Sequence, residues 1–411
     1  MSESEIWFQD PYAAFAQGRQ SAGPAFVPAV GAWVVARHDD VLEVLRRADV
    51  FSSSNTLPRD EMLPEAVRAE LADSIGGRPV VVNSDGAAHR RYRAPLLAGL
   101  TPARVEQVTP FIGQRAAELV EGFAGDGHVE FVSRYTAVLA SETIGRLIGL
   151  EPEEVAQAVH GTTQALIMYF FPVGDEQKAK AARKFAEMRA MIDAHVRRRH
   201  AEPRDDLSSV LLGALVPDDD GELTLDQRHE VASNVLNLFI AAFITATPLL
   251  GTMVLNLLRH REQWELLCAK PELIPAAVEE ATRYDTSMQS VRRITTAPVT
   301  LAGVEIPAGA TLLVALASAN RDAEVHDQPD TFDITRPTSS GAGSGAANHV
   351  SFGHGPHACV GAQLFREEAR ATLRALTQRL PNLRLAPQET GTMGRSVVPR
   401  DGSLQELKLV W

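Results

Sequence analysis

The chain has 411 residues, of which 45% are hydrophobic and 22% charged, which excludes a disordered, collagen-like or disulfide-scaffold protein. Its 40 basic and 52 acidic residues give a net charge of −12, which argues against whole-surface binding to nucleic acid or to an anionic membrane. With only two cysteines, Cys268 and Cys359, neither a disulfide framework nor a four-cysteine metal site can form.

The N-terminal residues do not resemble an export signal. Segment 1–17 lacks a basic stretch followed by a continuous apolar one, and Asp10 and Pro11 interrupt it early, so we expect a cytoplasmic protein. The most apolar stretch, 235–250, contains polar residues and Pro248 and is shorter than the roughly 20 residues that span a bilayer. It predicts a buried core helix and no membrane partner.

Hydrophobic periodicity predicts helices over most of the chain. Apolar residues recur at helical spacing over 39–48, 104–124, 130–148, 152–171, 176–200, 224–257, 273–284 and 362–379. Strand-like runs are short and lie at 25–36, 291–315 and 395–411. The predicted fold class is therefore mainly α with small β-sheets, an α+β protein.

One glycine- and serine-rich stretch, 339–346, has the composition of a linker. It lies a few residues before the most motif-dense part of the chain, so we interpret it as a mobile surface loop and not as a domain boundary. A single domain over 1–411 is expected.

The most specific pattern is a ten-residue run around one cysteine, FGHGPHACVG at 352–361. Its glycines let the backbone approach a bulky group, and Cys359 falls at the start of a predicted helix, which favours a thiolate. A sulfur ligand to iron needs such N–H donors, apolar cover from a residue such as Phe352, and room for a flat macrocycle. A lone cysteine is more often a small buried residue, and that is our interpretation of Cys268, which has no glycine or histidine nearby.

This run matches, without a gap, the motif F-G-x-G-x-H-x-C-x-G, and the chain resembles the cytochrome P-450 superfamily. The resemblance covers nearly the whole chain, with further matching segments in family order at 10–12, 85–93, 224–257, 280–283 and 319–322. It implies the cytochrome P-450 fold, with haem b (iron protoporphyrin IX) between the long central helix and the cysteine-loop helix. Cys359 would be the iron ligand, and Phe352, Gly353 and Gly361 would lie at the cofactor.

The resemblance implies further residues that bind or support the cofactor. His89, Arg93, Arg293 and His357 would contact the haem propionates, four cationic or hydrogen-bonding groups for two carboxylates, and Ala242 would lie beside the haem. By the same resemblance, a buried charged triad would hold the cysteine loop, so that losing one partner is strongly destabilising. Its members would be Glu280, Arg283 and Arg336.

The long helix departs from the family pattern at one position. Aligned on the A-G-x-[DE]-T segment, Ala241 and Thr245 match, but the acid position is Ile244, which can neither relay a proton nor hold water. Thr245 either donates to bound oxygen or bonds back to the carbonyl of Ala241. Pro248 should kink or open the helix, and the freed carbonyl of Ile244 would then hold a water instead of the missing acid.

The family position of the substrate pocket implies a mostly apolar wall with a few hydrogen-bonding groups, suited to a small or medium aromatic or peptide-like molecule. A core position is an equally good interpretation for any one of these residues, which are Val81, Val82, Phe243, Met288, Gln289, Ser290, Val397 and Val398, with Met168 to Phe171 near the lid.

By resemblance the protein is a soluble bacterial-type monooxygenase, an oxidoreductase that activates dioxygen at iron ligated by Cys359 and oxidises a small to medium organic substrate in secondary metabolism. Ile244 leaves open aromatic nitration, oxidative aromatic coupling or peroxide-driven oxidation, and a haem-thiolate sensor or carrier is the alternative of a different class.

No fused reductase or ferredoxin module is visible, so a monomer would receive electrons from a separate ferredoxin and ferredoxin reductase. The expected docking patch is Arg90, Arg91, Arg366 and Arg370.

Overall fold

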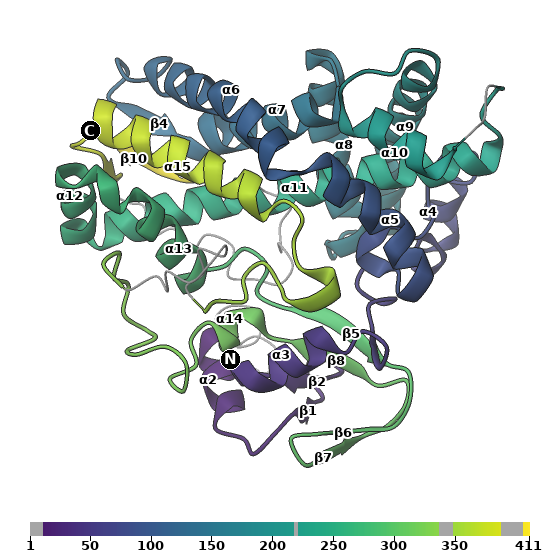
Figure 1. Cartoon of the computed structure of the whole chain (residues 1–411), viewed down its shortest axis with the longest axis horizontal. Coiled ribbons are helices and arrows are strands. Elements are labelled where there is room, and N and C mark those ends of the chain that lie inside the picture. The colour runs from purple at the N-terminus through teal and green to yellow at the C-terminus, as the bar shows by residue number, and fades with distance from the viewer. Residues whose placement is uncertain (1–10, 218–220, 337–347, 388–405) are drawn as a thin grey trace.

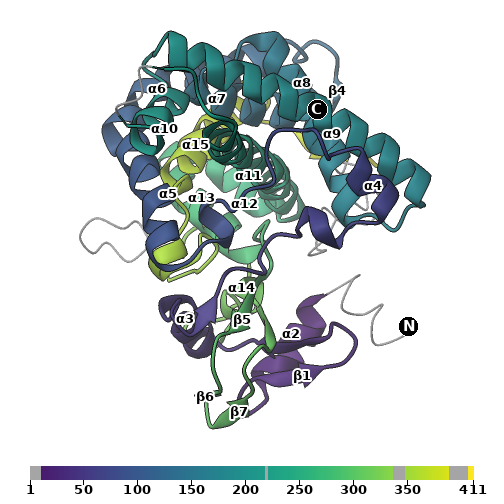
Figure 2. The same cartoon turned by 90° about the vertical axis from the view of Figure 1, so that its right-hand side faces the viewer.

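The computed structural model describes residues 11–217, 221–336, 348–387 and 406–411. Most helices pack together in a larger part of the molecule, while the main β-sheet and its accompanying helices form a smaller part (Figures 1 and 2). The predicted fold class, mainly α with small β-sheets, is confirmed.

The larger part is built from helices that pack side by side around one central helix, α11. These are α4 (Glu65–Ala69), α5 (Gly86–Gly99), α6 (Pro102–Glu121), α7 (Ala137–Ile148), α8 (Pro152–Phe170), α9 (Asp175–Ala201), α10 (Leu207–Leu215), α11 (Leu225–Arg259), α12 (Arg261–Ala269), α13 (Ile274–Tyr284) and α15 (Ala362–Arg379). The periodicity of the sequence did not predict α10, because an apolar run of nine residues is too short to be distinguished from a strand.

The smaller part contains a five-stranded sheet of order β1-β2-β8-β5-β3, in which the β2–β8 pair is parallel and the other neighbours are antiparallel. Its strands are β1 (Ala25–Val27), β2 (Ala32–Val35), β3 (Phe51–Ser52), β5 (Val291–Thr295) and β8 (Thr311–Val314). Helices α2 (Pro11–Arg19), α3 (His38–Arg46) and α14 (Leu316–Ala319) accompany it, and β6 (Val299–Leu301) pairs with β7 (Val304–Ile306) as a hairpin.

A third, small sheet of order β4-β10-β9 lies at the C-terminus of the chain. It consists of β4 (His128–Glu130), β9 (Arg384–Leu385) and β10 (Lys408–Val410). The helix predicted over 130–148 is therefore shorter, since Glu130 ends a strand and its carboxylate accepts the N–H groups of Val132 and Ser133 at 3.1 and 2.7 Å. A π-helical turn follows, and α7 starts only at Ala137.

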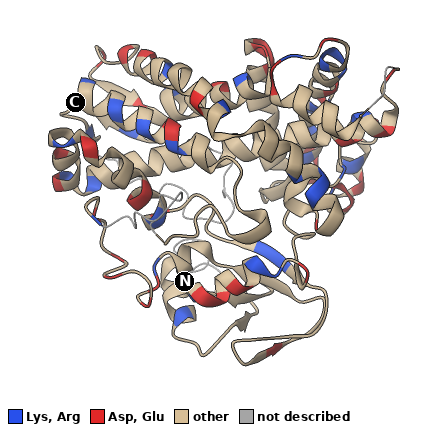
Figure 3. Ribbon diagram, viewed as in Figure 1, with Lys and Arg blue, Asp and Glu red and all other residues tan. Residues whose placement is uncertain are grey.

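Helix α11 begins where a capping box predicts it. Thr224 and Gln227 exchange hydrogen bonds between side chain and backbone, which satisfies N–H groups that the first turn leaves free. From Val231 to Leu258 the helix carries no Lys, Arg, Asp or Glu (Figure 3). It is long and apolar enough to cross a membrane, but 67% of its most apolar window is buried among the other helices, so α11 is a core helix here.

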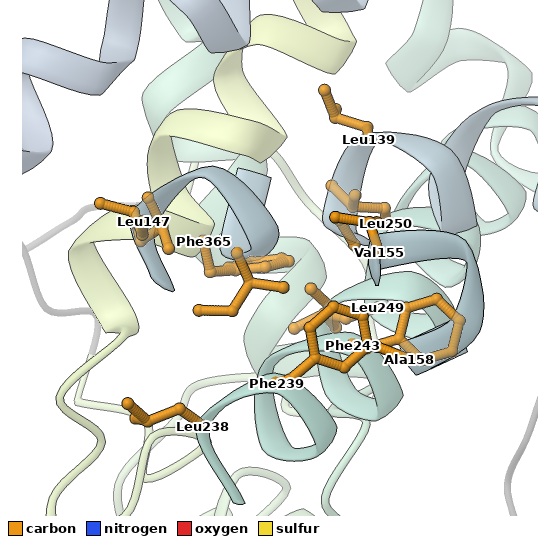
Figure 4. Packing of buried hydrophobic residues seen from close by; sticks show 14 of the residues in the cluster. Leu139, Leu147, Val155, Ala158, Leu238, Phe239, Phe243, Leu249, Leu250 and Phe365 are labelled. Carbon is orange, nitrogen blue, oxygen red and sulfur yellow. The ribbon is translucent and has the colours of Figure 1, made fainter. Parts of the chain in front are cut away.

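One face of α11 packs against α8. The rings of Phe239 and Phe243, one turn apart, stack with centroids 6.1 Å apart, and both belong to the same apolar cluster as Ala158 of α8 (Figure 4). Neither ring is exposed. The neighbouring face of α11 forms one wall of the cavity described below.

Candidate functional site

The loop at 352–361 has a backbone that only glycine permits at two places. Gly353 and Gly355 both have φ of 69°, and a Cβ on Gly355 would lie 2.6 Å from the carbonyl oxygen of Leu45 in α3. Inside the loop, the N–H of Cys359 donates to the carbonyl of Phe352 at 2.7 Å. The loop is thereby folded back on itself just before α15.

Cys359 precedes the first turn of α15, and the backbone N–H groups of Gly361 and Ala362 bond to its sulfur. Burial nevertheless raises the pKa of the thiol, and these N–H groups, together with Arg93 and Arg366, offset this only in part. The N–H groups at the helix start therefore favour the thiolate, as expected, but they do not outweigh the burial. A bound metal cation would favour the thiolate further.

The three residues of the expected triad come together. Arg283 binds Glu280 through two hydrogen bonds of 2.7 and 2.8 Å, and Nε of Arg336 lies 3.2 Å from the same carboxylate. The side chains of Glu280 and Arg283 are almost completely buried. Arg283 Nη1 also donates to the carbonyl of Asn320 at 2.9 Å.

Asn320 connects this triad to the cysteine loop. Its amide oxygen accepts the N–H of Val350 and its amide nitrogen donates to Ser351, both at 2.8 Å. Ser351 in turn donates to the carbonyl of Thr282. These bonds attach the segment just before Phe352 to α13, so the triad and the loop form one rigid unit.

A cavity of about 260 Å³ lies between the cysteine loop and α11. Small and apolar residues of α11 form one wall, and Cys359, which is enclosed by protein but exposed to the cavity, lies opposite among the loop residues. Of the residues predicted from the sequence, the lining includes Ala241, Ala242, Thr245, Met288, Arg293, Phe352, Gly353, His357, Cys359 and Gly361.

Basic and imidazole groups gather at one end of this cavity. The rings of His89 and His357 lie with centroids 4.1 Å apart, and Arg93 donates to the carbonyl of Ala358 at 2.6 Å. Nε2 of His89 is buried without a hydrogen-bond partner. Burial lowers the pKa of both histidines, that of His357 to about 4, and lowers the pKa of Arg293 to about 10. The four residues predicted to hold carboxylates are thus close together and desolvated, and Nε2 of His89 still lacks a partner.

An acid that we did not predict lies beside this cluster. Asp85 accepts hydrogen bonds from Ser52 and Ser53, and its Oδ1 lies 3.5 Å from Nε2 of His357. Burial by itself would raise the pKa of Asp85, but the hydrogen bonds from the two serines and the charge of His357 give a net lowering. Its position directly before α5 was the available signal, since aspartate commonly precedes a helix.

The turn of α11 around Thr245 has isoleucine at position 244, where the family pattern has an acid. Thr245 donates its hydroxyl to the carbonyl of Ala241 at 2.8 Å, so the second of the two arrangements expected for this hydroxyl holds. Ile244 is half-buried against the apolar core and is absent from the cavity lining. The opening expected at Pro248 does not occur, because α11 continues as α-helix through this turn and the packing on both sides holds it.

Several expected substrate contacts lie elsewhere. Phe243 is a core residue, because its face of α11 meets α8 and not the cavity. Val81 and Val82 pack in or against the apolar core. Of the next segment only Met288 lines the cavity, since the side chains of Gln289 and Ser290 are buried. Val397, Val398 and the 339–346 stretch lie outside the described residues. Of the lid residues, Met168 is buried, and Tyr169 donates to Asp60.

The expected basic patch is largely neutralised. Arg91 forms two hydrogen bonds with Glu230 of α11, and Arg366 forms two with the buried Glu279. Arg370 pairs with Glu367 within its own helix. Arg90 is exposed. Three of the four arginines of the expected patch are therefore paired with acids, which reduces its net positive charge.

Comparison with known proteins decides what this site belongs to. The family model described as cytochrome P450 matches residues 153–393, more than half of the chain. The chain belongs to the cytochrome P450 family. It is 33% identical over 395 residues to 6-deoxyerythronolide B hydroxylase of Saccharopolyspora erythraea, covering 93% of this chain and 92% of the relative.

Other P450 relatives agree with this assignment. Vitamin D(3) 25-hydroxylase of Pseudonocardia autotrophica is 32% identical over 93% of this chain and 89% of its own. The solved structure of cytochrome P450 CREJ in complex with (4-ethylphenyl) dihydrogen phosphate matches with a TM-score of 0.86 and 27% identity, over 98% of this chain and 97% of that one. The chain is thus a bacterial-type P450 monooxygenase, whose family uses a haem iron cofactor.

The residues present fit such a cofactor. A cysteine thiol faces a cavity whose opposite wall is made of small side chains, and a buried, unpartnered ring nitrogen of His89 lies in a cluster of cations. A flat, apolar macrocycle with a ligand position on one face and two carboxylates at one edge matches this distribution of groups.

Proposed function

We propose that this P450 binds haem b through the sulfur of Cys359 and oxidises a small to medium organic molecule with dioxygen. The position of Cys359 carries the proposal: its thiol faces the cavity below α11, in a loop attached to the buried Glu280 network. Bound iron with a thiolate ligand supplies dioxygen activation. The chain's own residues supply the ligand, hold the cofactor and exclude water.

The cation cluster is proposed to hold the two propionates. His89 Nε2 has no partner, and His357 and Arg293 line the same end of the cavity. Charge-assisted hydrogen bonds to carboxylates would satisfy these desolvated donors. We expect Arg93→Ala to retain less haem during purification than the wild type, while Arg90→Ala, a change of the same kind at an exposed position of α5, keeps it. Equal haem retention in both variants would contradict the role of Arg93.

The two cysteines provide the test of sulfur ligation. Reduced protein with bound carbon monoxide should show the far red-shifted absorbance of a haem with a thiolate ligand. Cys359→Ser should abolish this band, and Cys268→Ser should keep it, because Cys268 lies on α12 and packs against the apolar core. If folded, haem-supplied Cys359→Ser keeps the wild-type band, sulfur ligation at this position is wrong.

The substrate is proposed to be an apolar molecule of secondary metabolism, such as a macrolide-like or sterol-like compound. Support comes from the activities for which the relatives are named, on 6-deoxyerythronolide B and vitamin D(3), and from Met288, which is 39% exposed at the cavity. A compound library should be screened for a change in haem spin state, and hits of this class are expected. A clear preference for small charged compounds would overturn the assignment.

A second reaction is favoured by the turn at Thr245. With isoleucine at position 244 and the threonine hydroxyl engaged by Ala241, this turn offers no acid for proton delivery. Hydrogen peroxide brings both oxygen atoms and both protons, so peroxide-driven oxidation needs less of such a relay. Aromatic nitration and oxidative aromatic coupling are two further candidate reactions. Product analysis with electron donor and dioxygen, with peroxide alone, and with added nitric oxide separates them.

We further propose a cytoplasmic monomer that receives electrons from a separate ferredoxin and ferredoxin reductase. Arg90 and Arg91 are the exposed members of the expected patch, and Arg91 is paired with Glu230, so Arg90 is the member that we test. Arg90→Glu should slow reduction by a ferredoxin and leave reduction by dithionite unchanged. An unchanged ferredoxin rate would remove Arg90 from the docking surface.

A further inference from the structure

One buried acid in the cavity wall has no role in the chemistry described so far. Glu368 lies on α15, is 3% exposed, and stands on the apolar stripe of that helix, between Leu364 and Thr372. It lines the cavity together with Ala140 and Ile144 of α7. Among the described residues that line this cavity, Glu368 is the only carboxylic acid.

The surroundings of Glu368 disfavour its negative charge. Burial raises the pKa of its carboxyl from 4.5 to about 8, and the nearby hydroxyl of Thr143, which makes no hydrogen bond of good geometry, opposes this without outweighing it. The adjacent hydroxyls serve other acceptors: Thr372 donates to the backbone carbonyl of Glu368, and Tyr135 donates to Thr372. The raised pKa therefore favours the neutral carboxyl at neutral pH.

Glu368 forms no ion pair with another described residue. Around it, charged groups of the neighbouring helices are engaged in the pairs Arg366–Glu279, Arg370–Glu367, Arg115–Glu142 and Arg379–Glu121. Arg146 of α7 lies over the ring of Phe111, and Arg374 of α15 is exposed. Tyr135 on the adjoining π-helical turn is itself buried, with its pKa raised by burial and by the charge of Glu368. The other titratable groups in the cavity wall are Arg293, His354, His357 and Cys359.

We propose that Glu368 is kept as a neutral carboxylic acid in the wall of the cavity that takes the cofactor, and that its ionisation makes the cofactor harder to reduce. A fixed negative charge in this apolar wall would repel an added electron, because Coulomb interactions are weakly screened there. Where Glu368 is ionised, each electron that enters from the donor is accompanied by one proton, which the carboxylate takes up from solvent. This inference rests on haem binding at Cys359.

The test is a potentiometric titration of the holoenzyme with dithionite, from neutral to alkaline pH. In the wild type the midpoint potential should be flat below the pKa of about 8 and should fall above it, approaching about 59 mV per pH unit for one proton per electron. Glu368→Gln stays neutral at all pH values. It should match the wild type at neutral pH and lose most of the alkaline fall.

Glu367→Gln is the matched control, since it makes the same change one residue earlier, where the acid pairs with Arg370. It should keep the wild-type fall. An alkaline fall of equal size in Glu368→Gln, or its loss in Glu367→Gln, overturns the proposal. If Glu368→Gln does not fold, infrared spectra of the wild type decide: the carbonyl band of a buried protonated carboxyl should disappear near the same pH, and its absence at neutral pH would refute a neutral Glu368.

The spectrum of reduced protein with carbon monoxide is recorded first for every variant. Loss of the thiolate-type band would indicate a failure of haem ligation, which is a failure of the proposed function. A normal band with an unaltered pH dependence of the potential would be a failure of the Glu368 proposal alone.

Discussion

The hydroxyl of Thr245 donates to the carbonyl of Ala241, 2.8 Å away and one turn back on α11. The proton of this hydroxyl is therefore directed into the helix backbone. The preceding side chain is Ile244, half-buried against the apolar core. The acid–alcohol pair implied by the family resemblance is absent from this turn.

Replacing Thr245 should consequently have a small effect. We expect Thr245→Val to lower product formed per electron consumed by less than about tenfold, whereas losing a working general acid or base reduces rates by about 100-fold or more. Stability should change little, since valine has nearly the same shape. The product formed per electron consumed and the free energy of unfolding can both be measured with purified protein. A loss of about 100-fold would show that the hydroxyl leaves Ala241 during turnover.

Pro248 leaves the carbonyl of Ile244 without its helical partner, because proline has no N–H. As α11 is unbroken here, Pro248→Ala should restore a helical hydrogen bond. We expect a gain of about 1–2 kcal/mol in the free energy of unfolding, after the greater freedom of the unfolded chain is allowed for. Denaturant titration measures it. A loss of stability would mean that the proline ring fills space that alanine leaves empty.

The Glu280 carboxylate and the Arg283 guanidinium are nearly inaccessible to solvent. Removing the cation leaves the acid buried without its main partner, so Arg283→Ala should lower stability by about 3–5 kcal/mol and reduce haem incorporation, because Arg283 also bonds to Asn320. The control is Arg379→Ala, which removes an exposed pair with Glu121 and should unfold like the wild type. Equal behaviour of the two variants would contradict the structural role of the triad.

His195 should make the protein sensitive to acid. Its Nε2 lies 2.9 Å from Ser208, Nδ1 faces Arg198, and burial lowers its pKa from 6.5 to about 4. Between these values the unfolded state binds more protons than the folded state, so stability falls as the pH falls through this window and is unaffected above it. The contribution is at most about 1.4 kcal/mol per pH unit.

Replacing this histidine isolates its contribution. His195→Gln should reduce the slope of the unfolding free energy against pH, below the wild-type slope, by up to the equivalent of one bound proton. His200→Gln, at the partly exposed end of the same helix, should leave this slope unchanged. The remaining slope comes from other buried histidines such as His326, whose pKa burial lowers to about 3. An unaltered slope in His195→Gln would refute its role.

The sequence alone determined those features that depend on neighbours along the chain. The cysteine loop is a contiguous run, two of whose glycines take φ of 69°, the start of α11 is set by the capping box at Thr224 and Gln227, and Glu280 and Arg283 meet because three residues separate them on one helix. Chemistry carried by such local patterns needs no knowledge of the remainder of the fold.

Only the tertiary structure decided which faces of distant helices meet. Phe243 turns to α8 and away from the cavity, Arg91 and Arg366 find acids on α11 and α13, and Asp85 joins His357 across the molecule. Glu368 of α15 is buried because it lies in the wall of the cavity. Burial and charge pairing depend on contacts between segments far apart in the chain, and periodicity within one segment cannot specify them.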